Sequence, residues 1–182
     1  MIAKIMSITE NMKDCLIIGR SPFVNKVKWD KVDFNRFFVI CINYPVPDIP
    51  VDIVIARDET PKPVLAPLTK FISPRTGYYF TNVPKEDKDI MFVCYTSSSA
   101  VYIAQKMGFK RGYLIGIDHI EDDKPFVHYD GIVNKGVATS FSNKLCKDYI
   151  CSVKGISLYQ TNPTVKEQWD LPFVDISTLY SI

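Results

Sequence analysis

Six short apolar runs recur along this chain, and they constrain its fold more than any other feature. Two of them are CLIIG at residues 15–19 and FFVICIN at residues 37–43. Most of the runs are apolar throughout, as strands covered on both faces are, rather than alternating between apolar and polar residues. They therefore predict buried strands of a mostly parallel sheet. The other four runs lie at residues 51–56, 90–95, 112–118 and 155–161.

Helix patterns separate several of these runs. In SSAVYIAQKMG, the apolar residues Ala100, Ile103, Ala104 and Met107 recur at helical spacing, serines stand at the start and Gly108 follows the end. This pattern predicts a helix over about residues 98–107, and a second helix is expected over about residues 139–150. Strands that alternate with helices predict an α/β fold, here a three-layer, Rossmann-like domain.

Composition limits the classes of protein to consider. A chain of 182 residues that is 47% hydrophobic can bury one substantial core, so we expect residues 1–182 to form a single domain. The net charge of +2 lacks the basic excess of a nucleic-acid binder. No apolar run approaches the ~20 residues of a transmembrane helix, and the N-terminus does not resemble a signal peptide. We expect a cytoplasmic protein with no nucleic-acid partner, and oligomerisation is left open.

The five cysteines are widely spaced, and Cys15, Cys41 and Cys94 fall within apolar runs. Buried, reduced thiols are the expected interpretation, since neither a CxxC motif nor a cluster of Cys and His residues is present. The sequence therefore predicts no zinc site.

Polar residues end each of the six runs. Ligands of open parallel sheets bind beyond the carboxyl ends of the strands, so these residues are candidates for a binding site. Loops are polar in any protein, and a purely structural role stays open for each residue. The candidates are Gly19, Arg20 and Ser21, then Asn43, then Arg57, Asp58 and Glu59, then Thr96, Ser97 and Ser98, then Asp118 and His119, and finally Asn162 and Pro163.

The loop GRSP after the first run is the first candidate element. Gly19 would allow a sharp turn and a close approach of backbone N–H groups to a ligand. Arg20 or Ser21 would then contact a phosphate or a sugar hydroxyl. The alternative is an ordinary glycine turn after a strand.

The hydroxyls of Thr96, Ser97 and Ser98 form the second candidate element. They stand at the start of the first predicted helix, where unpaired N–H groups and the helix dipole favour an anionic or carbonyl-bearing ligand. The alternative is that one serine caps the helix and the others have no binding role.

The segment after the fifth run carries the only two histidines, His119 and His128, together with Tyr129. A histidine here could act as a general base near neutral pH, and Tyr129 could donate a proton to a leaving phosphate. The alternative is a surface loop in which the two histidines have no catalytic role.

Three stretches together resemble a known group of enzymes. The stretch CLIIGRSPFVNKVKWDKV, followed by FFVICIN, resembles the opening of the small bacterial lipooligosaccharide sialyltransferases and of the related motility accessory factors of flagellin glycosylation, which are similar to 6-hydroxymethylpterin diphosphokinases. TSSSAVYIAQKMGFKRGYLIGIDHI resembles their Thr-Ser-Gly segment, helix and following strand, and GISLYQTNPT resembles their last core strand. The matches occur in the same order along the chain.

This resemblance implies a GT-A-related fold that binds a nucleotide sugar, preferably CMP-linked, without an essential metal. It also implies transfer of the sugar to an acceptor hydroxyl. The acceptor is not identified by the resemblance. The residues that match its motifs are Gly19, Ser21 and Pro22 in the first loop, Asn43, Thr96 to Ser98, Asp118, and Tyr159, Asn162 and Pro163 in the last element.

The chain also departs from the family pattern. Ser98 replaces the glycine of the Thr-Ser-Gly segment, and no histidine stands near Ala138, where the family has its general base. His128 or His119 would then be the base. Two other hypotheses remain: a diphosphokinase or nucleotide hydrolase that binds Mg²⁺ through Asp58, Glu59 or Asp118, and a nucleotide-binding module without catalysis.

Overall fold

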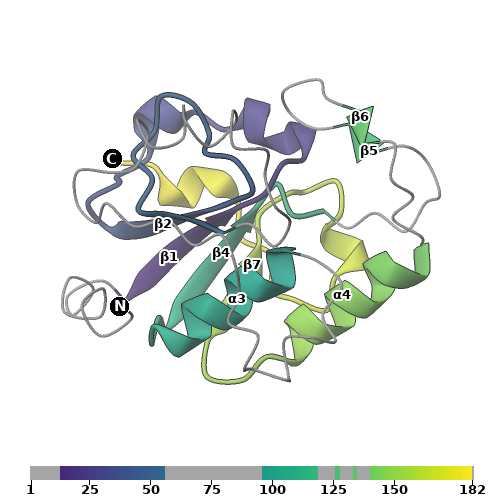
Figure 1. The fold of residues 1–182 in the computed structure, drawn as a ribbon. Helices are drawn as coiled ribbons and strands as arrows, with labels where there is room; N and C mark the ends of the chain where they lie inside the picture. The colour runs from purple at the N-terminus through teal and green to yellow at the C-terminus, as the bar shows by residue number, and fades with distance from the viewer. Residues whose placement is uncertain (1–12, 56–95, 119–125, 128–132, 135–139, 182) are drawn as a thin grey trace, which may run out of the picture.

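The computed structural model describes residues 13–55, 96–118, 126–127, 133–134 and 140–181, and within them it contains a five-stranded parallel sheet (Figure 1). The strand order is β3-β2-β1-β4-β7, and every neighbouring pair is parallel. This confirms the predicted α/β fold with a Rossmann-like sheet. The strands are β1 (Asp14–Ile18), β2 (Phe37–Ile42), β3 (Ile53–Ile55), β4 (Arg111–Ile115) and β7 (Ser157–Gln160).

Five of the six predicted runs form these strands, and the run at residues 90–95 lies outside the described residues. Every residue of β1 and β2 is buried. Their side chains alternate between two separate cores, so that Cys15 and Ile17 face one side of the sheet while Leu16 and Ile18 face the other. Continuous apolar sequence is the consequence of covering both faces. A separate antiparallel pair joins β5 (Phe126–Val127) and β6 (Val133–Asn134).

Within the described residues, two α-helices cover one face of the sheet (Figure 1). They are α3 (Thr96–Lys106) and α4 (Ser140–Ser152), close to the ranges that the sequence predicts. Ala100, Val101 and Ala104 of α3 are fully buried in the core beneath. Gly108 follows α3 with a φ of +85°, the left-handed conformation that commonly ends a helix at a glycine.

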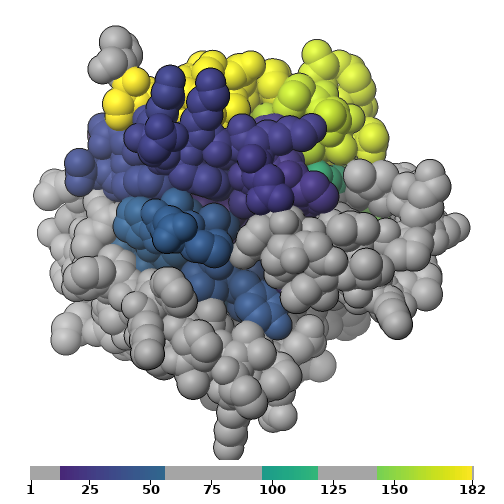
Figure 2. Space-filling model, turned by 90° about the horizontal axis from the view of Figure 1, so that it is seen from above, coloured from purple at the N-terminus to yellow at the C-terminus, as the bar shows by residue number. Residues whose placement is uncertain are grey.

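Short 3₁₀ segments cover the opposite face. They are η1 (Pro22–Lys26), η2 (Trp29–Lys31) and η4 (Ile176–Leu179), while η3 (Lys166–Gln168) packs near α4. Figure 2 shows this face, where segments early in the chain lie against the C-terminal segment in yellow. The Ser181 N–H donates to the Lys31 carbonyl at 2.7 Å, which joins the C-terminal segment to η2.

The C-terminal segment also protects the outer edge of β7. Gln160 donates its N–H to the Pro172 carbonyl, and its own carbonyl accepts the N–H of Val174, both at 3.0 Å. An unprotected edge strand would offer these groups to another chain. Residues 172–174 therefore cover this edge.

Cys15 and Cys41 are fully buried free thiols, as the sequence predicts. Burial raises the pKa of Cys41 to about 12 and also raises the pKa of Cys15. Cys94 lies outside the described residues. Among the helices of the described ranges, none has the length and apolar character needed to cross a membrane.

Candidate functional site

The strand order creates a switch point between β1 and β4. The chain proceeds from β1 to β2 and β3 in one direction, and then returns to place β4 on the other side of β1. In open α/β sheets, ligands bind in the crevice outside the carboxyl ends of the strands at such a point. We call this end of the sheet, where its five parallel strands finish, the carboxyl edge, and the opposite end the amino edge.

The loops after β1 and β4 lie against each other at this point. The Gly19 N–H donates to the Ile115 carbonyl at 2.8 Å, and the Ser21 N–H donates to the Gly116 carbonyl at 3.0 Å. A Cβ atom at Gly19 would lie 2.3 Å from the Gly116 carbonyl oxygen, closer than any real contact. Gly19 is therefore needed for the packing of the two loops. The sequence predicts that backbone N–H groups of this loop approach a ligand. The N–H groups of Gly19 and Ser21 are instead hydrogen-bonded within the protein.

Ser21 and Pro22 begin η1. The buried Ser21 Oγ accepts the Phe23 N–H at 3.1 Å, which makes Ser21 the N-cap, and Pro22 occupies the first position of the segment, where its fixed φ fits. These two predicted site residues thus shape the loop beside the switch point.

Asp118 follows β4 and is almost fully buried, with 6% of its surface exposed. Burial raises the pKa of its carboxyl group, although hydrogen bonding from the Ser21 and Asn162 side chains and the positive charge of Lys26 act in the opposite direction. Its Oδ1 atom is buried and has no hydrogen-bond partner among the residues that the structure describes. The fold thus brings together three predicted site residues from three different loops, Ser21, Asp118 and Asn162.

Asn162 is fixed by its own turn. Its Oδ1 accepts the N–H and the Oγ1 hydroxyl of Thr164 at 3.1 and 2.8 Å. Because this oxygen is used, the amide NH₂ is the group of Asn162 that can donate to Asp118.

Two residues that the sequence did not predict hold this region in place. Gln160 donates its side-chain amide to the Ile117 carbonyl at 3.1 Å, and Trp169 donates its indole N–H to the Asp118 carbonyl at 3.0 Å. Gln160 carried a weak signal, as a polar residue at the end of an apolar run. Trp169 carried none, since it lies 51 positions from Asp118.

Arg20 and Asn43 also lie at the carboxyl edge. The Arg20 guanidinium lies 4.3 Å from the centre of the Tyr44 ring, a cation–π contact between the loops after β1 and β2. Asn43 adopts a φ of +65° and donates its N–H to the Ile55 carbonyl at 2.8 Å. Asparagine is among the residues that tolerate this left-handed conformation, so Asn43 has a structural role in the turn. Sequence reasoning missed Tyr44.

Thr96, Ser97 and Ser98 lie in the first turn of α3 and are buried. The hydroxyls of Ser97 and Ser98 contact the Sγ of Cys146 on α4 at 3.4 and 2.7 Å. These two side chains therefore take part in the contact between the helices, a role that the sequence did not predict.

Six predicted site residues lie outside the residues that the structure describes. Three of them, proposed for catalysis, are His119, His128 and Tyr129. The other three follow the third predicted run and are Arg57, Asp58 and Glu59. In the described ranges, no three side chains of His, Cys, Asp or Glu gather as a metal site would require.

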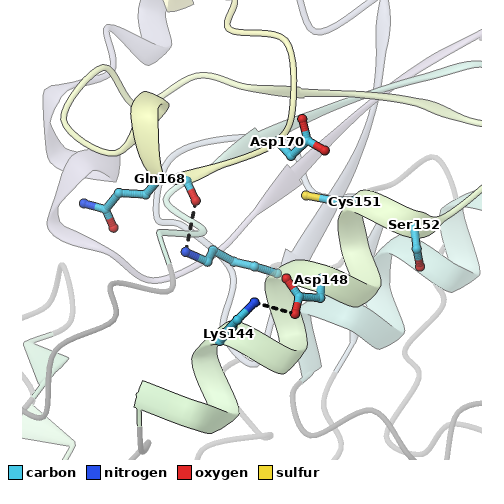
Figure 3. Close-up of a pocket in the computed structure, with 7 residues that line it drawn as sticks. Lys144, Asp148, Cys151, Ser152, Gln168 and Asp170 are labelled. Carbon is cyan, nitrogen blue, oxygen red and sulfur yellow. Dashed lines mark hydrogen bonds and ion pairs between the residues drawn. The ribbon is translucent and has the colours of Figure 1, made fainter.

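A surface hollow of about 380 Å³ lies between α4 and the segment after β7 (Figure 3). It contains the exposed ion pair of Lys144 and Asp148, and Lys147 donates to the Gln168 carbonyl across it at 3.0 Å. Cys151 also lines the hollow and is half-buried. Burial raises the pKa of its thiol, and this disfavours the reactive thiolate form. The described lining residues include none of the predicted site residues.

The sheet and its switch point define an α/β protein with a Rossmann-like fold. Comparison with known proteins adds no closer relationship, because no family model, curated protein or solved structure matches the chain.

Proposed function

We propose that this protein binds a nucleotide at the carboxyl edge, between the loops after β1 and β4. The observation that carries the proposal is Asp118 at the switch point, a buried carboxylate whose Oδ1 has no partner within the described ranges. Native proteins rarely leave a buried polar atom unpaired, and a ligand would supply the missing hydrogen bond. Crevices at this position of a Rossmann-like sheet commonly hold nucleotides.

Positive side chains near Asp118 suit the phosphate. Arg20 lies at the same edge, and the charge of Lys26 acts on the Asp118 carboxyl group. A guanidinium can form two parallel hydrogen bonds to phosphate, and its stacking on Tyr44 restricts its orientation. Arg20 is therefore the proposed phosphate contact.

The proposed reaction is transfer of a sugar from a nucleotide sugar, CMP-linked, to an acceptor hydroxyl. It is supported by the resemblance to sialyltransferases over the strand-end loops. In this proposal His128 or His119 removes the proton of the acceptor, and Tyr129 donates to the departing phosphate. No metal is required, so chelation should leave transfer unchanged, whereas a Mg²⁺ requirement would favour a diphosphokinase.

Binding is tested by thermal unfolding and calorimetry with CMP, UMP, GMP, AMP and a CMP-linked sugar. A ligand at 100 times its Kd should stabilise the fold by about 2.7 kcal/mol. For a chain of this size that corresponds to a rise in Tm of roughly 5 to 10 °C. No shift with any of these compounds would overturn the proposal. Binding without release of CMP from the sugar donor would limit it to a nucleotide-binding module.

Two arginines allow a matched test of the phosphate contact. Arg20 stacks on Tyr44 at the carboxyl edge, whereas Arg36 lies over Phe37, 5.2 Å from the ring centre, at the amino edge. Arg20→Ala should weaken nucleotide binding by about 10-fold and reduce its salt dependence, because a charged contact is lost. Arg36→Ala should bind as the wild type does. Equal affinities of the two variants would show that the phosphate binds elsewhere.

A further inference from the structure

The unpaired Oδ1 atom of Asp118 limits the kind of chemical group that a ligand can place beside it. The carboxyl group receives hydrogen bonding from Ser21 and Asn162, and among the described residues these donors leave Oδ1 buried and without a partner. An ionised carboxylate can only accept hydrogen bonds. The group that completes this site must therefore be a donor.

Phosphate cannot be that group. Its oxygens are acceptors and carry the same sign of charge as Asp118, so a phosphate is favoured at Arg20 and Lys26 instead. The donors that a nucleotide does offer are the ribose hydroxyls, an exocyclic amino group in cytosine, adenine and guanine, and a ring N–H in uracil and guanine.

Resting on the nucleotide-binding function proposed above, we propose that Asp118 Oδ1 accepts a hydrogen bond from a neutral O–H or N–H donor of the nucleotide. A ribose hydroxyl is the first candidate, because every ribonucleotide carries it. Asp118 then determines specificity, since a ligand without a donor at this position leaves the buried oxygen unpaired. Ser21 and Asn162 are positioning residues that orient the carboxyl group.

The substitution Asp118→Asn tests this proposal. Ser21 and Asn162 are both donors toward the carboxyl group, so the new amide oxygen should take their side and the new NH₂ should replace Oδ1. The shape is kept while an acceptor becomes a donor. We expect CMP binding, measured by calorimetry, to weaken about 10- to 100-fold, the range for a hydrogen bond to a charged group. The matched control is Asp14→Asn at the amino edge, which should leave CMP affinity unchanged.

Wild-type ligand selectivity gives a second test that needs no variant. If a ribose hydroxyl is the donor, CMP should bind at least about 10-fold more tightly than 2′,3′-dideoxy-CMP. If the cytosine amino group is the donor, CMP should exceed UMP by a similar factor. Either preference supports the proposal and should disappear in Asp118→Asn.

The possible failures are distinguishable. If the wild type binds no nucleotide, both the proposed function and this inference are overturned. If the wild type binds CMP while Asp118→Asn binds it equally or more tightly, the proposed nucleotide binding is supported, but the hydrogen bond from a ligand donor to Asp118 Oδ1 is excluded. Equal affinity of the wild type for CMP, dideoxy-CMP and UMP would exclude this hydrogen bond as well.

Discussion

Two buried aspartates at opposite edges of the same sheet have opposite surroundings. Asp14, the first residue of β1, has 5% of its surface exposed, and Asp118 beyond β4 has 6%. At the amino edge, Arg111 Nε lies 2.7 Å from Asp14 Oδ1, and this partner raises the pKa of Arg111. At the carboxyl edge, no residue in the described part of the chain forms a hydrogen bond with Asp118 Oδ1.

The difference shows that burial alone does not identify a binding site. Both carboxylates are removed from water, but only Asp14 has its charge balanced by a direct ion pair. A satisfied buried group stabilises the sheet, whereas an unsatisfied one destabilises the native state until a ligand reaches it. The buried carboxylate at the amino edge therefore has its partner within the fold, whereas the buried carboxylate at the carboxyl edge keeps one unsatisfied oxygen.

The largest effect should come from breaking the carboxyl edge itself with Gly19→Ala. The new Cβ would lie 2.3 Å from the Gly116 carbonyl oxygen, which belongs to the backbone and cannot rotate away. We expect the free energy of unfolding to fall by about 3 kcal/mol, as for a severe overpacking. Urea denaturation measures the change.

Gly108→Ala is the matched control for that substitution. Gly108 has a φ of +85°, but a Cβ there meets no atom within 4 Å. Only the left-handed backbone is penalised, at about 1 kcal/mol. Equal losses in the two variants would contradict the steric role assigned to Gly19.

The next effect tests the amino edge. Arg111→Ala should leave the Asp14 carboxylate buried without its partner and lower the free energy of unfolding by about 1 to 2 kcal/mol. The loss is smaller than for a fully buried pair because the Arg111 side chain is 51% exposed. Urea denaturation of Arg111→Ala and Lys110→Ala, an exposed neighbour, separates the ion pair from a general loss of charge. No difference between the two variants would mean that Asp14 needs no counter-charge.

Asp118→Asn sharpens the comparison, because it should not destabilise the free protein at neutral pH. The pKa of Asp118 is raised in the fold, so its contribution to stability is fully present below its ordinary pKa of 3.8 and is lost as the pH rises through the folded pKa. Asparagine does not ionise, so the Asp118→Asn variant does not lose this stability as the pH rises. Relative to the wild type, it should therefore gain stability as the pH is raised from about 4 toward neutrality, measured by urea denaturation. A constant difference across this range would show that burial does not shift the Asp118 carboxyl group.

The sequence predicts the strands and helices better than it predicts how the residues at the carboxyl edge come together. Strands β1 and β2 were predictable because both faces are buried and every position must be apolar, and α3 because its spacing and its terminal glycine are local signals. Asp118, Ser21 and Asn162 were predictable as strand-end residues. Their convergence follows from strand order, which is a property of the whole sheet.

Other features could not be predicted, because they depend on residues far apart in sequence. The contact of Ser98 with Cys146 spans 48 positions, and it gives the serine a role in packing where the helix pattern suggested a ligand. Gly19 was recognisable as a special turn residue, but the atom that requires it, the Gly116 carbonyl oxygen, belongs to another strand end. A local sequence pattern therefore identifies a helix or a turn, whereas contacts with distant residues determine the role of its side chains.

The smallest effect concerns a third aspartate, whose pH dependence should have the opposite sign. Asp175 is the N-cap of η4, and its Oδ1 accepts the Ser177 N–H at 2.9 Å and the Ser177 hydroxyl at 2.7 Å. These bonds lower its pKa below 3.8, so its contribution to stability is present above that pH and is lost as the pH falls through the folded pKa. Asp175→Ala should cost less than about 1 kcal/mol at neutral pH, because the cap is exposed and belongs to a short segment. Asp175→Asn should keep the cap and remove only the pH dependence, since asparagine caps nearly as well. Urea denaturation of both variants at acid and neutral pH measures the two effects, and a stability of Asp175→Asn that still falls with pH as the wild type does would assign the dependence to another group.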